Sequence, residues 1–433
     1  MNDPRGPLVA GSHKPDAAMV AGENLLSRYD RIRAHSFNLA KPLSEEDCCV
    51  QSMPEASPVK WHLAHTTWFF ETFVLEKFEK SFKPFLPAFR VLFNSYYNGV
   101  GEKHPRPQRG LLTRPALHEV LFYRRQVDER MAKVLAQLES DQAFRALVEL
   151  GLHHEQQHQE LILTDIKHLL SLNPLKPAYR EQDAGETRAP TGIEWLAFEG
   201  GLVEIGHGGG GFFFDNESPR HRQYLNSYRL ASRLVTNGGI LDFIADGGYR
   251  DPRLWLSDGW DWVQAGKVTH PIYWERHDEH WGEFTLGGMR VLDPVAPAAH
   301  LCYFEADAYA RWAGARLPAE AEWEHAARAC EATDDTVRIE GLHPRPSGKA
   351  AGLQQMFGEA WQWTQTSYAP YPGYAWPEGA VGEYNGKFMV NQYVLRGSSC
   401  LTPAGHSRVT YRNFFPATAR WQMSGIRLAK DGL

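Results

Sequence analysis

Cysteine is scarce in this chain, and the few cysteines present are poorly spaced for cross-linking or metal binding. The 433 residues contain five, namely Cys48, Cys49, Cys302, Cys330 and Cys400, with no Cys-x-x-Cys pair and no even number to pair off. This spacing argues against a disulfide framework and against a cysteine-built zinc or iron–sulfur site. We therefore expect a protein of a reducing compartment, the cytoplasm.

Long apolar runs and an excess of basic charge are missing as well. No stretch approaches the roughly 18 apolar residues of a membrane helix. The 46 Lys and Arg stand against 52 Asp and Glu and form no basic stripe, which argues against a nucleic-acid partner. Residues 1–22 are rich in Gly, Pro and Ala without an uninterrupted apolar region, so we predict a disordered tail rather than a signal peptide.

Aromatic residues, in contrast, are plentiful. The chain has 14 Trp, 17 Tyr and 22 Phe. Many of them will belong to the core, but such a supply also favours a pocket for a cationic or aromatic small molecule.

The first part of the chain has the apolar spacing of α-helices. We expect one helix from Leu25 to about Phe37 and three more near residues 57–78, 115–138 and 141–172. Four helices with a long connection between the second and the third indicate a bundle over residues 23–175. The interior of such a bundle is a usual place for metal ligands from facing helices.

Helical periodicity then stops, and residues 176–193 are predicted to be a linker. Residues 194–433 contain short strand-like runs and loops rich in Gly and Trp. Two helices are expected among them, at residues 305–314 and 319–329. The sequence therefore predicts an α+β protein of two domains.

The most informative segment is His154-Glu155-Gln156-Gln157-His158 in the fourth helix. Positions four apart differ by about 40° around a helix, so His154 and His158 point the same way, and Gln157 lies about 60° to the other side of His154. Glu160 projects roughly 140° from the midpoint of the pair, so we do not interpret it as a ligand. This holds although two His and one carboxylate is a known iron-binding set.

The kind of metal site that the histidine pair could form depends on the third ligand. The literal His-Glu-x-x-His also matches a zinc-protease pattern. His168 follows downstream, but no glycine turn precedes it, as a metzincin requires. On the second helix, Trp61-His62-Leu63-Ala64-His65 offers His62 and His65, and position alone does not choose between them.

Five segments together resemble the ergothioneine-biosynthetic sulfoxide synthases, non-heme iron enzymes of the EgtB family. They are KWHLAHTTWFFE, HHEQQHQE, FDNESPRHR, RLPAEAEWEHAAR and YRNFFPATARWQMSGIRLA. The resemblance covers nearly the whole chain from about residue 25. It implies a DinB-like four-helix bundle followed by a formylglycine-generating-enzyme-like (C-type-lectin-like) α+β domain, residues 194–433, that completes the substrate pocket.

The resemblance also implies a cofactor and its ligands. Fe(II) would be held by His65, His154 and His158, since the first ligand of the family ends an x-Leu-Ala-His motif. Neutral imidazoles hold Fe(II) and leave coordination positions open for substrates. His62 becomes a neighbour of the site, with a plain packing role equally open. Gln157 aligns with the glutamine that hydrogen-bonds the substrate imidazole in the family.

Enzymes of this family use O2 to join a cysteine-type thiol to the imidazole carbon between the two nitrogens of hercynine (Nα-trimethylhistidine), which gives a sulfoxide. The quaternary ammonium would lie against aromatic faces. Asn413, Phe414 and Phe415 match the Asn-aromatic position of the family near the C-terminus. The resemblance therefore implies that these three residues reach across to complete the pocket.

The sulfur donor is implied by two further positions. Phe415 stands where the members that use γ-glutamylcysteine carry an Asp. Tyr96 and Tyr97 look like the tyrosine pair of the branch that uses free cysteine, and one or both could act as general acid. A guanidinium fork suits the donor carboxylate. The arginines that the resemblance offers for it are Arg106, Arg109 and, more weakly, Arg420.

The hypothesis from the sequence is thus an Fe(II)- and O2-dependent oxidoreductase that forms hercynylcysteine sulfoxide. A selenoneine synthase, which joins hercynine to a selenosugar, stays open. Formylglycine generation is improbable, because no second cysteine follows Cys400. A non-catalytic DinB/lectin-like binding protein is disfavoured, because buried histidines that converge beside a glutamine are typical of a catalytic site.

Overall fold

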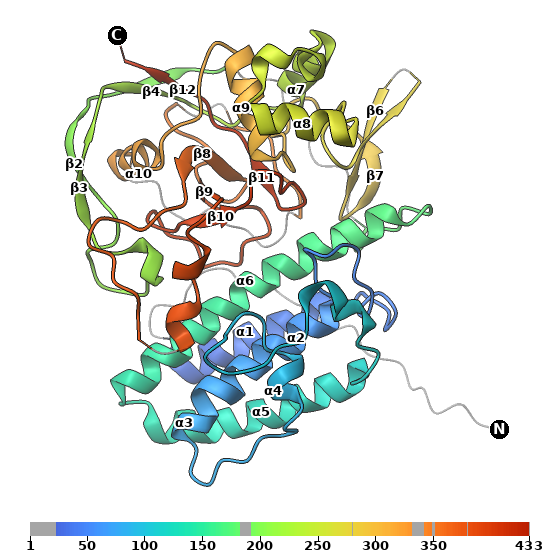
Figure 1. Ribbon diagram of the computed structural model, residues 1–433, viewed down its shortest axis with the longest axis vertical. Coiled ribbons are helices and arrows are strands. Elements are labelled where there is room, and N and C mark those ends of the chain that lie inside the picture. Colours follow the sequence, from blue (N-terminus) through green and yellow to red (C-terminus); the bar gives the residue numbers. More distant parts are fainter. Residues whose placement is uncertain are drawn as a thin grey trace.

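The computed structural model consists of a helical part and a mixed α/β part that lie one above the other (Figure 1). It describes residues 23–181, 192–278, 280–330, 342–348, 351–378 and 380–432. The predicted tail, residues 1–22, lies outside these ranges, as do residues 182–191 of the predicted linker. The predicted α+β fold, with a helical bundle before the mixed part, is confirmed.

The helical part is built from four long helices. These are α1 (Leu25–Ala40), α2 (Val59–Phe69), α5 (Leu117–Leu138) and α6 (Gln142–Leu172). Helix α2 continues through a π-helical turn (Phe70–Leu75) into α3 (Glu76–Phe78), and α4 (Phe89–Leu92) lies in the connection to α5. Side-chain caps explain two of the starts, because the Asn24 and Asp141 side chains accept hydrogen bonds from the backbone at Ser27 and Phe144.

Within the described ranges, the mixed part contains small sheets and four α-helices. One sheet has the order β1 (Trp195–Phe198), β4 (Tyr228–Ala231), β12 (Ala429–Asp431). A second has the order β10 (Asn413–Phe415), β9 (Tyr393–Arg396), β8 (Trp361–Ser367), β11 (Ser424–Gly425). The remaining strands form a hairpin of β2 (Gly201–Ile205) and β3 (His221–Leu225) and a meander of β5 (Trp274–His277), β6 (His280–Thr285) and β7 (Gly288–Val291).

Two of the helices in this part were predicted and two were missed. Helices α9 (Tyr303–Trp312) and α10 (Glu320–Ala329) lie where the sequence predicts them. Helices α7 (Asn237–Ala245) and α8 (Ser257–Gly266) were not anticipated, because their glycines weaken the intrinsic helix signal. Within the described ranges, no helix is both long and apolar enough to cross a lipid bilayer.

Helix α6 lies between the two parts and contacts both (Figure 1). On the side of the mixed part, the Glu160 carboxylate accepts hydrogen bonds from Trp361 Nε1 at 2.8 Å, Ser399 Oγ at 2.5 Å and Thr402 Oγ1 at 2.7 Å. Glu160 is therefore directed away from the histidine pair, which agrees with its helical angle. It joins the two parts of the molecule instead.

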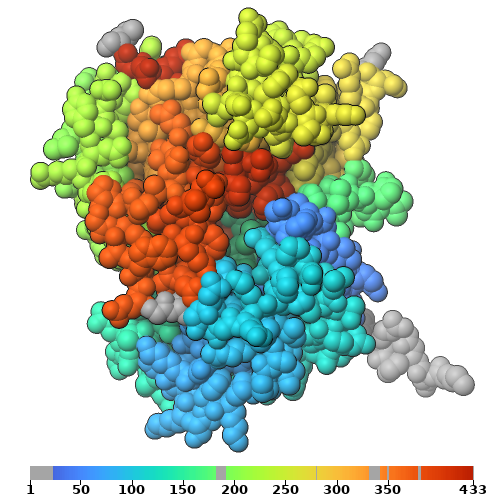
Figure 2. All heavy atoms as spheres, in the orientation of Figure 1, coloured from blue at the N-terminus to red at the C-terminus, as the bar shows by residue number. Residues whose placement is uncertain are grey.

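A second contact between the parts is visible on the surface in Figure 2, where the orange segment of the mixed part rests on the cyan segment of the bundle. Here the Glu383 carboxylate accepts hydrogen bonds from the backbone N–H groups of Asn98 at 3.0 Å and Gly99 at 2.6 Å. Lys387 donates to the backbone carbonyl of Tyr96. These contacts hold the loop that carries the tyrosine pair.

On its bundle side, helix α6 carries a buried ion-pair network centred on Glu155. Arg33 donates to its carboxylate at 2.9 Å, Ser36 Oγ donates at 2.6 Å, and Arg124 also donates. Burial alone would raise the pKa of Glu155, but the Arg124 and Arg33 guanidiniums outweigh it and hold this pKa at about 2. Glu155 is thus fully engaged in the bundle and is not placed as the general base of a zinc protease.

Replacing Glu155 with Gln should lower the free energy of unfolding of the metal-free protein by about 3 kcal/mol, because the buried Arg124 guanidinium loses its counter-charge and Arg33 keeps only the Asp128 carboxylate, at 2.7 Å. The matched control is Glu149→Gln on the same helix, whose carboxylate pairs with Arg28 at 2.7 Å and is 35% exposed. We expect the control to lose less than about 1 kcal/mol. Urea denaturation followed by circular dichroism measures both, and equal losses would contradict a special role of Glu155.

Candidate metal centre and substrate pocket

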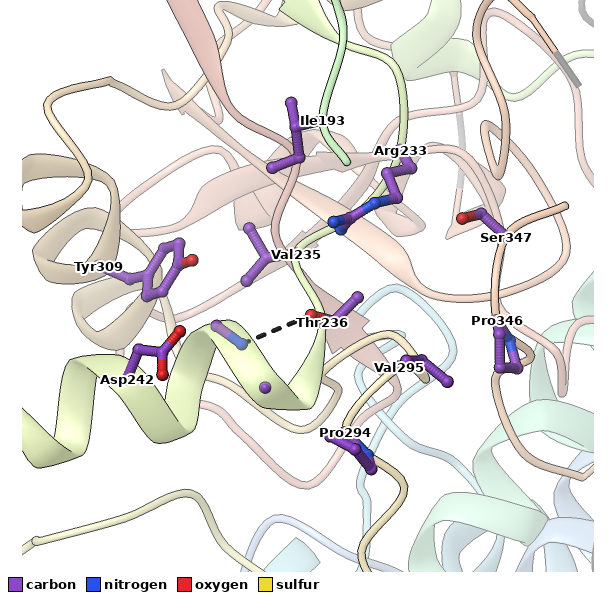
Figure 3. A pocket seen from close by; sticks show the side chains of 12 residues that line it. Ile193, Arg233, Val235, Thr236, Asp242, Pro294, Val295, Tyr309, Pro346 and Ser347 are labelled. Atoms are coloured by element: carbon purple, nitrogen blue, oxygen red, sulfur yellow. Dashed lines mark hydrogen bonds between the residues drawn. The ribbon is translucent and has the colours of Figure 1, made fainter. Parts of the chain in front are cut away.

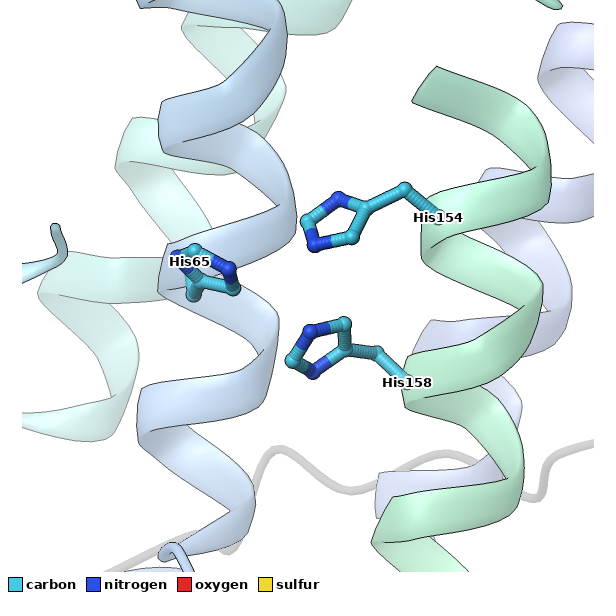
Figure 4. Close-up of side chains that lie close together, drawn as sticks. All are labelled: His65, His154 and His158. Carbon is cyan, nitrogen blue, oxygen red and sulfur yellow. The ribbon is translucent and has the colours of Figure 1, made fainter. Parts of the chain in front are cut away.

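Three histidines from two neighbouring helices face one another inside the bundle (Figure 4). His65 comes from α2, and His154 and His158 come from successive turns of α6. One ring nitrogen from each lies within 4.8 Å of the others. No carboxylate or cysteine joins this group among the residues that the structure describes. In the structure, the cluster therefore contains His65 rather than His62, and the metal-ligand role of these three histidines stays a prediction.

Hydrogen bonds determine which nitrogens of the cluster are available. His65 Nδ1 lies 2.6 Å from the backbone carbonyl of Phe93, so it donates, and its Nε2 is left without a hydrogen-bond partner in the described ranges. Both ring nitrogens of the buried His154 lack a partner there as well. His158 Nδ1 lies 2.8 Å from His62 Nδ1, which leaves its Nε2 to the cluster.

The protonation states of the cluster suit a metal. Burial, reinforced by the neighbouring histidines, lowers the pKa of His65 and of His158 well below that of a free histidine. Burial also lowers the pKa of His154 to about 3. Buried polar nitrogens without partners are costly unless something binds them. Three neutral imidazoles with free lone pairs therefore fit a divalent transition-metal ion such as Fe(II).

Aromatic rings enclose the cluster and connect it to the tyrosine pair. The Trp61 and Trp68 rings are stacked with His65, at centroid distances of 4.6 and 5.5 Å. Tyr97 lies beyond Trp68 at 5.6 Å and contacts Tyr96 at 4.6 Å. Burial raises the pKa of both phenols, so both stay protonated near neutral pH.

Gln157 lies beside the cluster and reaches the mixed part of the molecule. Its Nε2 donates to the Tyr411 hydroxyl at 2.6 Å, and its Oε1 accepts a hydrogen bond from Tyr384. The Tyr384 ring lies 5.6 Å from His154 and is stacked with Phe214 at 5.4 Å. Sequence reasoning missed Tyr384 and Tyr411, because no local pattern connects either residue with the histidine motif more than 200 positions away.

The three candidate arginines occupy different environments. Arg106 is exposed and donates to the backbone carbonyl of Glu55. Arg420 is partly exposed and lies 3.9 Å from the Glu305 carboxylate. Arg109, in contrast, is buried against the Trp61 ring at 3.4 Å.

Arg109 has the environment of an anion-binding residue. Its guanidinium donates to Ser57 Oγ at 2.9 Å and Ser95 Oγ at 3.0 Å, and no carboxylate within the described ranges forms an ion pair with it. Burial and the nearby Arg106 lower the pKa of Arg109. The Asp165 carboxylate attracts this charge without forming an ion pair with it. A buried cation without a directly paired carboxylate is unfavourable, so an incoming carboxylate would stabilise it.

The segment from Asn413 to Phe415 forms strand β10, and its side chains alternate between the two faces. Phe414 is stacked with Tyr368 at 4.0 Å. Phe415 packs edge-on against Trp421 at 5.8 Å. Since successive side chains of a strand point to opposite faces, Asn413 and Phe415 share one face and Phe414 takes the other. The structure therefore does not direct all three predicted residues to one surface.

A separate cavity of about 490 Å³ lies in the mixed part, at the start of helix α7 (Figure 3). It is lined by residues such as Thr236, Asp242, Pro294 and Tyr309. Thr236 caps the helix there by accepting from Gly239 N–H. None of the predicted site residues lines this cavity, so it is separate from the histidine cluster.

Comparisons with known proteins agree with both parts of the fold. The sulfatase-modifying factor enzyme 1-like domain family matches residues 181–349 and 334–432, and the DinB superfamily matches residues 28–162. Hercynine oxygenase of Mycobacterium tuberculosis is 31% identical over 440 residues, which span 95% of this chain and 100% of that protein. Hercynine oxygenase of Mycolicibacterium thermoresistibile is 29% identical, over 98% and 97% of the two chains.

A further relative matches a smaller share of the chain. The formylglycine-generating enzyme of Mycobacterium tuberculosis is 27% identical over 225 residues, which span 37% of this chain and 70% of that protein. The hercynine oxygenases, by comparison, match over both parts. The chain therefore belongs to the hercynine oxygenase family, the ergothioneine-biosynthetic sulfoxide synthases, and it is an oxidoreductase.

Proposed function

We propose that this enzyme joins the imidazole C–H carbon of hercynine to the sulfur of free cysteine, with O2 as oxidant and Fe(II) bound by His65, His154 and His158. The products are hercynylcysteine sulfoxide and water. One oxygen atom becomes the sulfoxide oxygen, and the other leaves as water with the C–H and S–H hydrogens. Formation of the C–S bond and oxidation of the sulfur supply the four electrons that O2 takes up. Residues 23–175 would hold the metal, and residues 194–433 would complete the pocket.

The observation that carries the proposal is the cluster of three neutral imidazoles beside Gln157, in a chain that matches hercynine oxygenases over their full length. When bound there, Fe(II) would supply open coordination positions and electrons for the reduction of O2. Gln157, held by Tyr384 and Tyr411, can present its remaining amide hydrogen to the substrate imidazole. Aromatic faces such as Phe214 and Tyr384 suit the quaternary ammonium of hercynine.

The choice of cysteine as donor rests on Arg109 and Phe415. Arg109 is a buried guanidinium whose N–H groups can bind the carboxylate of the sulfur donor. Phe415 leaves no acidic group at the position where the members that use γ-glutamylcysteine carry an Asp. A short donor with one carboxylate fits this arrangement best.

The proposal is tested by anaerobic loading of the enzyme with Fe(II), followed by addition of hercynine, O2 and one donor at a time. We expect mass spectrometry to detect the sulfoxide with cysteine, at a higher kcat/KM than with γ-glutamylcysteine or a selenosugar. A preference for the selenosugar would instead support a selenoneine synthase. Iron loading without any hercynine-derived product would contradict the proposed reaction.

His154→Ala should abolish binding of one equivalent of Fe(II) per chain, because two imidazoles cannot replace a three-ligand site. His168→Ala is the matched control, since His168 is also a buried histidine of helix α6 but hydrogen-bonds Ser52 Oγ at 2.8 Å instead. Anaerobic Fe(II) titration with metal analysis measures both variants. Iron binding that survives in His154→Ala would remove this histidine from the ligand set.

Arg109→Gln should raise the KM for cysteine by about 10- to 100-fold, because charge-assisted hydrogen bonds contribute roughly 1.5–3 kcal/mol. The affinity for hercynine should stay within about twofold of the wild type. Arg106→Gln, at an exposed neighbouring position, is the control and should change neither value appreciably. Steady-state kinetics with each substrate varied separately checks this. A larger increase of the KM for cysteine in Arg106→Gln than in Arg109→Gln would indicate that Arg106, and not Arg109, binds the carboxylate of the sulfur donor.

Tyr97→Phe should lower kcat by about 100-fold or more while metal and hercynine affinities are kept, because the variant loses only the acidic proton. Tyr96→Phe serves for comparison. We expect the smaller effect there, since Tyr96 is less buried than Tyr97. Because the pKa of both phenols is raised, the wild-type rate should not decline through phenol ionisation between about pH 7 and 9. An unchanged kcat in Tyr97→Phe would exclude it as the proton donor.

A further inference from the structure

Asp165 is a buried carboxylate that the proposed reaction does not use. It lies on helix α6, seven residues after His158, so about two turns separate the two residues on the same face of the helix. Its Oδ2 accepts hydrogen bonds from Ser57 N–H at 2.8 Å and from His62 Nε2 at 3.1 Å. Its Oδ1 accepts a third from Trp421 Nε1 at 3.2 Å. The residues that donate to it come from the bundle and from the mixed part.

These contacts determine the tautomer of His62. A carboxylate that accepts from Nε2 requires the proton of a neutral His62 ring to be on Nε2, so Nδ1 carries the lone pair. His158 Nδ1 lies 2.8 Å from that lone pair and must therefore donate its N–H to it. The proton of His158 is thereby held on Nδ1, and the lone pair on Nε2 is directed to the cluster.

We infer that Asp165 and His62 form a positioning relay that fixes the tautomer and ring orientation of His158 as a metal ligand. A histidine ligand that donates its second N–H to such a partner is oriented and made more basic. His65 obtains the same support from the Phe93 carbonyl, with Nδ1 and O at 2.6 Å. The inference rests on the metal centre of the proposed function, but it does not depend on the substrate or the donor.

The relay also connects the metal ligand with the mixed part of the molecule. Trp421 donates to Asp165 and packs against Phe415, with ring centroids 5.8 Å apart. A displacement of the C-terminal segment would therefore act on the same carboxylate that holds His62.

The relay is tested by measuring the affinity of the metal-free protein for Co(II), a spectroscopic probe, in two variants of His62. His62→Leu removes the acceptor for His158 and should weaken Co(II) binding about 10- to 100-fold. His62→Asn places an amide oxygen near the position of the imidazole Nδ1, so it keeps an acceptor and should recover most of the affinity. Equal weakening in the two variants would mean that His62 only fills space, which would overturn the relay.

Proton NMR of the Co(II)-loaded protein gives a readout that packing alone would not change. In the wild type, the paramagnetically shifted N–H signals of His65 and His158 should exchange slowly, because both N–H groups are hydrogen-bonded. His62→Leu should lose one of them, His62→Asn should keep both, and the control His168→Gln should match the wild type. Two unchanged signals and an unchanged Kd in His62→Leu would overturn the inference.

Trp421→Phe tests the connection with the mixed part, because it removes the indole N–H and keeps an aromatic ring. We expect a smaller loss of Co(II) affinity, about two- to fivefold, together with faster exchange of the His158 N–H. A wild-type exchange rate would remove Trp421 from the relay. If wild-type protein bound no Co(II) at all, the metal centre itself would fail. Normal binding without an effect of His62→Leu would refute the relay alone.

Discussion

The rotation of helix α6 about its own axis is the constraint on which the site depends, and the buried carboxylate of Glu155 fixes it. Arg33 and Arg124 hold this carboxylate from two other helices of the bundle. With Glu155 directed into the bundle, the positions one before and three after it must face α2. His154 and His158 therefore meet His65. A helix held only by apolar contacts could rotate at lower cost, since such contacts are not directional.

The same helix also makes the pocket a product of both parts of the molecule. Glu160 joins α6 to the loop after β9, and Gln157 receives its partners Tyr384 and Tyr411 from the mixed part. In the proposed function, the bundle supplies neutral imidazoles, and the mixed part supplies the groups that orient a substrate beside them. A chain with either part alone would lack half of these contacts.

Much of the fold and of the cluster could be predicted from local patterns. Apolar periodicity located the helices of the bundle, and helical angles removed Glu160 from the ligand set. The missed helices α7 and α8 have glycines that weaken their intrinsic signal, and packing in the mixed part stabilises them instead. Asp165 could have been found, because seven residues after His158 is two helical turns. Its role needed His62, which belongs to another helix.

The sequence by itself determined the spacing of His154, Gln157 and His158, since helix geometry relates residues a few positions apart. Through its motifs it also indicated the family. Only the tertiary structure brought His65 to the pair and assigned the free nitrogen of each ring. It also separated the buried Arg109 from the exposed Arg106. The physical reason is that burial, tautomer and counter-charge depend on neighbours from distant segments, and no local period in the chain records which segments meet.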